Sequence, residues 1–152
     1  MKTWPLVVAL IAISPLSAPL SLAAGTDETP TAPAAVNDLE EGRKAVKAKQ
    51  WRTAITHLEK ALAKDRNNAD IHNWLGYSYR NSGNVPKGMD HYNVALKLNP
   101  NHRGAHEYIG QGYLTLKNKP KAEEHLSALE KICGKKCEEY EDLAKAIAAY
   151  KP

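Results

Sequence analysis

Residues 69–102 decide the fold of this chain and read ADIHNWLGYSYRNSGNVPKGMDHYNVALKLNPNH. In the first half of this stretch large apolar side chains recur at helical spacing, as in Leu75 and Tyr79, and the spacing resumes in the second half. Ser82-Gly83-Asn84 separates the two halves, and such a run is typical of a helix end followed by a turn. The stretch therefore predicts two amphipathic helices that pack against each other.

The same pattern recurs on both sides of this stretch at an offset of 34 residues. The offset aligns residues of similar size in three sets, Gly42, Gly76, Gly110; Ala54, Gly88, Ala122; and Leu58, Tyr92, Leu126. A fourth set aligns Ala61 and Ala95 with the larger Leu129. One helix pair cannot bury its apolar stripe alone, so neighbouring pairs must stack. We therefore expect three repeats, at 35–68, 69–102 and 103–136, followed by a capping helix over 138–150.

The middle repeat resembles the tetratricopeptide repeat family, whose pattern has a Leu-Gly pair, a Tyr, a small residue, an aromatic, an Ala and a closing Pro. The residues that carry this resemblance are Leu75, Gly76, Tyr79, Gly88, Tyr92, Ala95 and Pro100. The third repeat has Gly134 instead of the Pro, and the first is weakest, with Ala45 instead of the Tyr. The resemblance implies an all-α, right-handed superhelical stack of three helix-turn-helix repeats plus the C-terminal capping helix. The first helix of each repeat would line a concave face.

Residues 1–23 have the layout of a secretory signal peptide. Lys2 precedes an apolar run at 6–13, and Ser21-Leu22-Ala23 places small residues before a cleavage site after Ala23 or Ala24. Residues 24–34 are predicted to form a flexible leader. We therefore expect an exported bacterial protein that is periplasmic or secreted, with no stable membrane insertion once the signal is cleaved.

Composition bounds the function classes. The chain has 152 residues, of which 43% are hydrophobic and 25% charged, and this excludes a multi-span membrane protein, a collagen and a wholly disordered chain. The net charge of +4 is too mild to indicate nucleic-acid binding. The sequence has no glycine-rich phosphate loop, nucleophile elbow or metalloprotease motif, so we predict a protein without enzymatic activity or cofactor.

The family register nominates residues for a partner-binding groove. The concave positions correspond to Arg43, Val46, Lys47, Asn73, Tyr77, Arg80, Asn81, Glu107, Gln111 and Leu114. Tyr, Arg and Asn can hydrogen-bond a peptide backbone while offering apolar contact, although an ordinary exposed helix surface has the same composition. We predict a scaffold or assembly factor that holds an extended or helical segment of an envelope protein. The basic residues of the first repeat favour an acidic segment.

One subtype of the family is excluded at the residue level. Repeat proteins that bind the carboxylate tail of cytosolic chaperones use Lys and Asn in the first unit, Asn in the second, and Lys and Arg in the third. The matching positions here are Leu39, Arg43, Trp74, Gly104 and Tyr108. That clamp is absent, which agrees with export from the cytoplasm.

Cys133 and Cys137 are separated by three residues, so they form neither a thioredoxin motif nor a haem attachment site. Export to an oxidising compartment favours a disulfide, which would join the third repeat to the capping helix. A redox-active pair or reduced thiols remain open, and a redox or metal-handling protein is the alternative function. The adjacent pairs Glu123-Glu124 and Glu138-Glu139 are interpreted as solvent-facing charge. Self-association through an exposed end of the stack is also open.

The six histidines follow the repeat. His57, His91 and His125 are 34 residues apart, as are His72 and His106, whereas His102 lies outside the pattern. We expect each periodic histidine to pack against the neighbouring repeat rather than to converge on one metal ion. His102 and His106 have metal-compatible helical spacing, but nothing in the sequence supplies the remaining ligands, and we predict no metal site.

Overall fold

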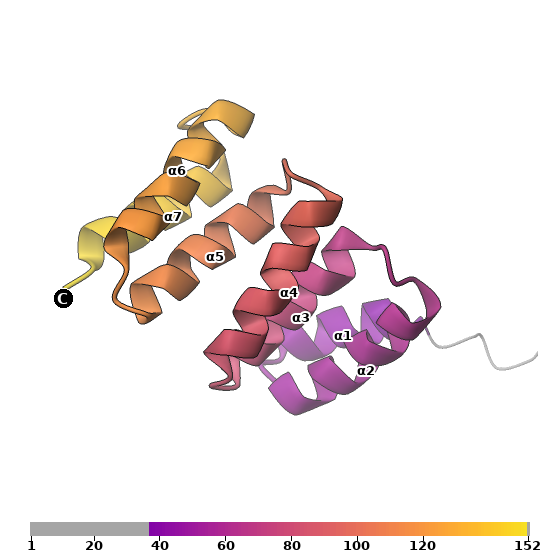
Figure 1. Cartoon of the computed structure of the whole chain (residues 1–152). Coiled ribbons are helices and arrows are strands. Elements are labelled where there is room, and N and C mark those ends of the chain that lie inside the picture. Colours follow the sequence, from indigo (N-terminus) through magenta and orange to yellow (C-terminus); the bar gives the residue numbers. More distant parts are fainter. Residues whose placement is uncertain (1–36, 152) are drawn as a thin grey trace, which may run out of the picture. The chain divides into compact units, whose positions relative to one another are not determined.

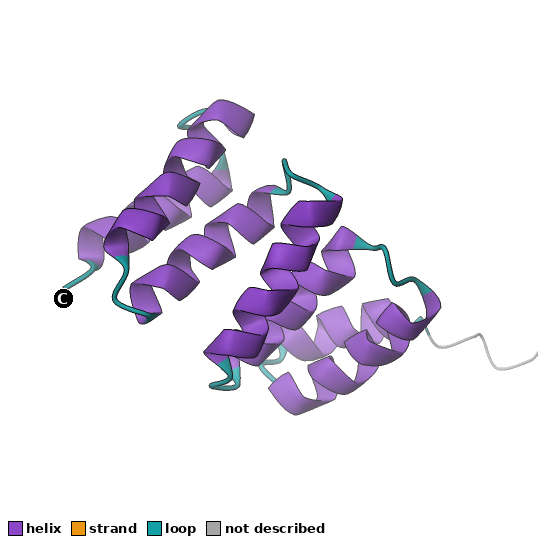
Figure 2. Cartoon of the chain, in the orientation of Figure 1, coloured by secondary structure: helices purple, strands orange, loops and turns teal. Residues whose placement is uncertain are grey.

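The computed structural model describes residues 37–151, which form α-helices joined by short connections and contain no β-strand (Figures 1 and 2). The helices are α1 (Asp38–Lys47), α2 (Trp51–Lys64), α3 (Ala69–Asn81), α4 (Val85–Leu98), α5 (Arg103–Thr115), α6 (Lys119–Cys133) and α7 (Glu138–Ala149). None of the helices in this part of the chain has the length and apolar character needed to cross a membrane. The predicted signal peptide and leader lie outside the described residues.

The helices pack as consecutive pairs, α1 with α2, α3 with α4 and α5 with α6 (Figure 1). The first helices of neighbouring pairs also touch, α1 with α3 and α3 with α5, and α7 packs on both α5 and α6. The expected all-α helical repeat stack is confirmed. The order α1, α3, α5, α7 places the first helix of every pair, and then the last helix, along one side of the stack.

The turn inside each pair has the same backbone conformation. Lys49, Gly83 and Lys117 lie 34 residues apart and all have positive φ, at 56°, 95° and 57°. After the last two of these turns, the Oδ1 atoms of Asn84 and Asn118 accept hydrogen bonds from backbone N–H groups in the first turn of α4 and α6. The repeat in the sequence is therefore a repeat of one left-handed turn geometry.

Close approach of the two helices in the middle pair explains its glycines. A Cβ atom on Gly88 would lie 2.8 Å from the carbonyl oxygen of Gly76, and a Cβ on Gly76 would lie 2.5 Å from the ring of Tyr92. Tyr92 is fully buried as a result. Tyr77 packs against the apolar clusters on both sides of α3 and so connects the first pair to the rest of the stack.

In the third pair, the side chain that packs on the glycine of the first helix comes from α7 and not from α6. A Cβ atom on Gly110 would lie 2.5 Å from a methyl group of Leu143, which is fully buried in α7. Leu126 occupies the position equivalent to Tyr92 but is only partly buried. Leu143 of the capping helix thus makes the contact with Gly110 that the repeat alignment predicts for Leu126.

The periodic histidines pair within a repeat, and only His72 and His106 also bond to the preceding repeat, so the prediction that each packs against its neighbouring repeat holds in part. The Nδ1 atoms of His72 and His91 lie 3.1 Å apart, and those of His106 and His125 lie 3.0 Å apart. Each pair joins the first and second helix of one unit. In the first unit Asp38 stands where the others have histidine, and its carboxylate lies 3.2 Å from Nδ1 of His57.

The second nitrogen of each inner histidine is also bonded. Nε2 of His72 lies 3.3 Å from the carbonyl oxygen of Arg66, and Nε2 of His106 lies 2.9 Å from that of Pro100. A carbonyl can only accept, so Nε2 carries the hydrogen in both rings, and Nδ1 is left as an acceptor for the partner histidine. These rings are therefore occupied in holding helix pairs together.

Candidate functional site

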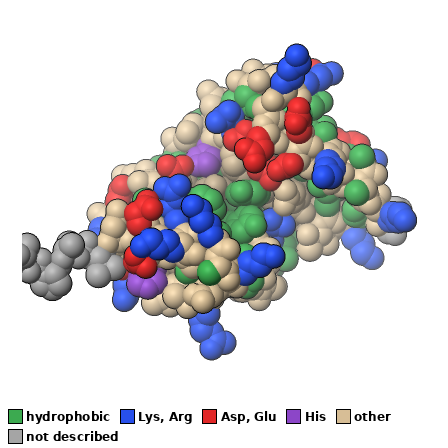
Figure 3. All heavy atoms as spheres, turned by 180° about the vertical axis from the view of Figure 1, so that it is seen from behind, with side chains coloured by type: hydrophobic (Ala, Val, Ile, Leu, Met, Phe, Trp, Pro, Cys, Tyr) green, Lys and Arg blue, Asp and Glu red, His purple; other side chains and the backbone are tan. Residues whose placement is uncertain are grey.

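A cavity of about 360 Å³ opens on the side of the stack formed by α1, α3, α5 and α7. Its volume lies within the range of ligand-binding pockets. On one face of the molecule, Figure 3 shows an apolar hollow in green between a group of Lys and Arg side chains in blue and a group of Asp and Glu side chains in red. The lining residues of the cavity have the same division, with a basic residue from α1 and acidic residues from α5 and α7.

The end near α1 is basic and aromatic. The guanidinium of Arg43 lies over the ring of Trp74, 5.7 Å from its centroid, and pairs with Glu40 at 3.2 Å. Tyr108 of α5 faces the same cavity. An aromatic surface beside a guanidinium suits a segment that combines apolar and acidic side chains.

The positions of the chaperone-tail clamp all lie on this cavity, although their residue types differ. They are Leu39, Arg43, Trp74, Gly104 and Tyr108. Only Arg43 of these five residues is among the predicted groove residues. Arg43 is the single cation among these five positions, and the other four offer apolar, aromatic or backbone surface.

The end near α7 is acidic. We call Glu107, Glu138, Glu139 and Asp142 the acidic wall, and all four line the cavity. Glu139 is 22% exposed and pairs with Arg103 at 3.4 Å, so its interpretation as solvent-facing charge is wrong. The α7 acids could have been recognised from their spacing, because residues four apart on a helix share a face. That they line the same cavity as Glu107 could be learned only from the packing of α7 on α5.

Glu107 is the most deeply placed member of the wall, with 7% exposure. Nε2 of Gln111 donates a hydrogen bond of 2.8 Å to Glu107, and Nη2 of Arg80 donates one of 2.9 Å to Gln111. Burial raises the pKa of Glu107 to about 8, and the nearby charges of Asp142 and Glu139 raise it further, while Arg80 opposes them. A carboxyl group in this state is poised to change its charge when a cation approaches.

Asn73 lies on the same cavity and is 5% exposed. Its side-chain oxygen is buried and has no hydrogen-bond partner among the described residues. A buried acceptor without a donor is costly and is rare in native structures. This atom therefore identifies a place where a ligand N–H group could bind.

The predicted groove residues divide into three groups. Arg43, Asn73 and Glu107 line the cavity, and their role in binding stays a prediction. Tyr77, Arg80 and Gln111 do not line it, although Gln111 bonds to Glu107, and the guanidinium of Arg80 lies 5.6 Å from the centroid of the Tyr77 ring. Lys47 and Asn81 are exposed and do not line it.

Two further residues that the register placed in the groove belong to the interior. Val46 is buried in the apolar cluster of the first pair, and Leu114 packs against the cluster formed by α6 and α7. Helix α7 covers the face of α5 that a further repeat would otherwise use. The sequence register could not show this because the capping helix has no equivalent in the earlier repeats.

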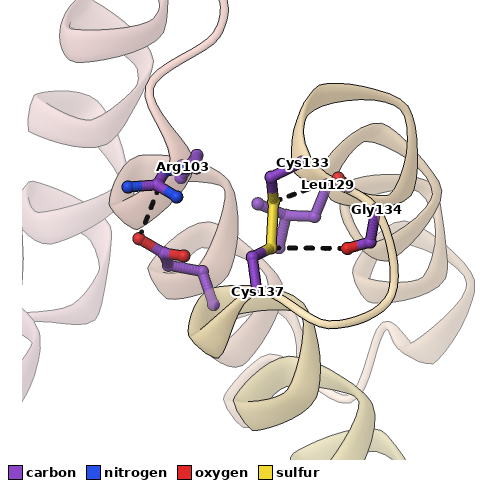
Figure 4. Close-up of a disulfide and its surroundings, with 6 residues drawn as sticks. Arg103, Leu129, Cys133, Gly134 and Cys137 are labelled. Carbon is purple, nitrogen blue, oxygen red and sulfur yellow. Dashed lines mark hydrogen bonds and ion pairs between the residues drawn. A yellow bond between two sulfur atoms is a disulfide. The ribbon is translucent and has the colours of Figure 1, made fainter.

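The Sγ atoms of Cys133 and Cys137 lie 2.02 Å apart, which is disulfide distance, across the connection between α6 and α7 (Figure 4). Helix α6 ends at Cys133 because Gly134 follows with a φ of 78°. Sγ atoms of both cysteines lie within 4.8 Å of a carboxylate oxygen of Glu139, and this is the one such cluster of three ligand atoms within residues 37–151. Figure 4 also shows Arg103, which lies near the disulfide and pairs with Glu139.

Comparisons with known proteins agree with the fold. The family model described as "Anaphase-promoting complex, cyclosome, subunit 3" matches residues 47–129, which is more than half of the chain. The TPR domain of Arabidopsis OM64 has a TM-score of 0.67 at 15% identity over 75% of this chain and 93% of that one. The TPR2B domain of yeast Sti1 in its complex with pHsp70 has a TM-score of 0.66 at 15% identity, over 75% of this chain and 95% of that one.

A third solved structure is bacterial. MamA from Desulfovibrio magneticus RS-1 has a TM-score of 0.60 at 23% identity, over 62% of this chain and 54% of MamA. No curated protein matches the sequence. At these identities the structural matches establish the fold alone.

Proposed function

Because the chain belongs to the family described as "Anaphase-promoting complex, cyclosome, subunit 3", a family of tetratricopeptide repeats, we propose that it is a non-enzymatic module that binds a segment of another protein. The observation that carries this proposal is the cavity on the side of the first helices, which combines aromatic surface, charges of both signs and a buried unpartnered acceptor. The TPR2B domain of yeast Sti1, which shares this fold, forms a complex with pHsp70.

We further propose that the protein acts in the bacterial periplasm or outside the cell, as a scaffold or assembly factor for an envelope partner. The signal-peptide layout of residues 1–23 supports export. The disulfide supports an oxidising compartment. Intact-mass measurement of protein purified from the full-length gene should show loss of residues 1–23 or 1–24 and one oxidised cysteine pair.

Site-specific photo-cross-linking in the native host tests the binding function. A photoreactive amino acid in place of Asp70, which is exposed at the cavity, should give a cross-linked partner. The matched control is the same replacement at Asp90, an exposed aspartate of α4 that does not line the cavity. Equal cross-linking from both positions, or none from either, would contradict binding at this site.

The structure also favours one alternative. If the disulfide is reduced, Cys133, Cys137 and Glu139 offer three ligand atoms close enough for one metal ion. After treatment with mild reductant, one part of the sample is alkylated to count the open thiols, and a second part, left unalkylated, is titrated with Zn²⁺; together these distinguish the two functions. A pair that resists reduction supports a structural bond, whereas a pair that opens readily and then binds Zn²⁺ supports redox or metal handling.

A further inference from the structure

Resting on the proposed function, we propose that the acidic wall is a subsite for one lysine or arginine side chain of the bound protein segment. The charge of the cavity carries the argument first. Five carboxylates line it, from Asp70 and the acidic wall, against one guanidinium, that of Arg43. Two of these carboxylates already have a partner: Asp70 accepts a hydrogen bond of 3.0 Å from Nε2 of His102, and Glu139 forms an ion pair with Arg103 at 3.4 Å.

The remaining three carboxylates have no ion-pair partner within residues 37–151. They belong to Glu107, Glu138 and Asp142. They converge on the cavity from two helices, α5 and α7. Glu138 and Asp142 are exposed, whereas burial and the charges of Asp142 and Glu139 raise the pKa of Glu107 to about 8. A bound cation would therefore favour ionisation of a carboxyl group that the empty site keeps mostly protonated.

The geometry favours an organic cation over a metal ion. In the described part of the chain, three candidate ligand atoms come within 4.8 Å of one another only at Cys133, Cys137 and Glu139, and not on the acidic wall as a whole. A metal ion needs its oxygen ligands close around one point. A guanidinium or ammonium group on a long stem distributes several N–H donors over a wider space.

Asn73 gives a second, independent indication of a donor-bearing ligand. Asn73 lines the cavity, and its side-chain oxygen is buried without a hydrogen-bond partner among the described residues. An N–H group from the segment would satisfy this atom. The same segment could then extend its basic side chain toward Glu107 and Asp142.

The state of Glu107 agrees with a cation subsite. Its pKa is raised to about 8 by burial first and then by Asp142, Glu139 and Glu138 of α7, with Arg80 of α3 opposing. A cation in contact would favour the ionised carboxylate, so binding would release a proton near neutral pH. Because Arg43 lies at the α1 end, we expect a segment that is acidic toward α1 and basic toward α7.

A random-peptide array tests this inference with protein purified from the full-length gene. The wild type should select peptides that carry Lys or Arg, and the Glu107→Gln/Asp142→Asn variant should lose this preference, with affinity for the selected peptides falling at least about tenfold. Glu141→Gln is the matched control, because Glu141 is exposed on α7 and does not line the cavity. Circular dichroism verifies that each variant is folded.

The outcomes separate the inference from the function on which it rests. Peptides that bind the wild type without a basic residue, or a basic preference that survives in the double variant, would overturn the subsite alone. An array on which no peptide binds would overturn the proposed function and the subsite with it. Equal loss of the preference in Glu141→Gln would also overturn the subsite, since a general loss of acidic charge would then explain the result.

Discussion

At the scale of single residues, the histidines show how a pattern typical of metal ligands arises from packing. His91 and His125 sit against the rings of Tyr79 and Tyr113, with centroids 5.5 and 5.8 Å apart. His102 stands at the helix N-cap where the preceding repeat has Asn68, and its Nδ1 accepts from the backbone N–H of Ala105. Each of these rings therefore has a structural partner.

The histidine pairs predict acid destabilisation. Burial and the neighbouring histidine lower the pKa of His91 and of His125 to about 4. The unfolded rings take up protons below about pH 6.5, so between pH 6.5 and 4 the unfolded state binds more protons and stability falls as the pH falls. Thermal unfolding should show a Tm several degrees lower at pH 5 than at pH 7. The fall should be shallower in a His91→Leu/His125→Leu variant, and an equal fall in both proteins would contradict this account.

The left-handed turn residues predict a stabilising substitution. Lys117 has a φ of 57°, where a Cβ atom costs about 1 kcal/mol, whereas the equivalent turn residue Gly83 has no Cβ. Lys117→Gly should therefore raise the free energy of unfolding by about 0.5–1 kcal/mol in urea titrations. Lys117→Ala is the control, because it removes the side chain but keeps the Cβ atom. A gain of the same size in both variants would show that charge, and not backbone conformation, is the cause.

At the scale of elements, the fold depends on the closeness of α3 to α4 and of α5 to α7. Backbone meets backbone at Gly88, whereas the nearest group to Gly110 is the side chain of Leu143. Cys133 and Cys137, which lie at disulfide distance, flank the short connection through which α7 turns back onto α5 and α6. Helix α7 thus closes the core of the last pair and also supplies three members of the acidic wall.

Gly88→Ala tests the contact between α3 and α4. The new methyl would lie 2.8 Å from the Gly76 carbonyl oxygen and 3.0 Å from the Arg80 nitrogen, so the helices must separate. We expect a loss of about 1–3 kcal/mol in the free energy of unfolding. Gly112→Ala on α5 is the matched control, since its nearest neighbour is the flexible end of Met89. Equal stability of the two variants would show that the contact between α3 and α4 is not tight.

At the scale of the whole molecule, charge is arranged along the cavity from Arg43 at α1 to the acidic wall at α7. Such an arrangement gives a bound segment a direction, because each end of the segment meets a charge of one sign. The arrangement has a cost in stability at the acidic end, where Glu107 is buried among other carboxylates. Sites that bind ligands commonly carry such a cost.

Glu107→Gln should therefore stabilise the free protein at alkaline pH. The folded-state pKa of Glu107 is raised to about 8, so the folded state keeps a proton that the unfolded state loses above about pH 4.5. Stability contributed by this group falls as the pH rises from 4.5 through 8. We expect a gain on the order of 1 kcal/mol at pH 9, discounted because the cavity is open to solvent, and none near pH 4. Urea titrations at the two pH values measure it, and a gain independent of pH would contradict the assignment.

The sequence by itself determined the helix pairs and their turns. A 34-residue offset brings Gly42, Gly76 and Gly110 into register, and local rules of helix periodicity and turn formation act on residues close in the chain. The clamp positions carried over from the family register, such as Trp74 and Tyr108, do line the cavity. The helix pairs and turns recur along the sequence, and a recurring pattern can be recognised without knowing how the chain packs.

Only the tertiary structure decided what does not repeat. The acids of α7 face Glu107, Leu143 takes the contact with Gly110, and His72 pairs with His91 across its own helix pair. Each of these contacts joins residues that are distant in the sequence and depends on the angle at which one helix meets another. The register fixes which side of a helix a residue occupies, but packing of side chains across helices fixes what it touches.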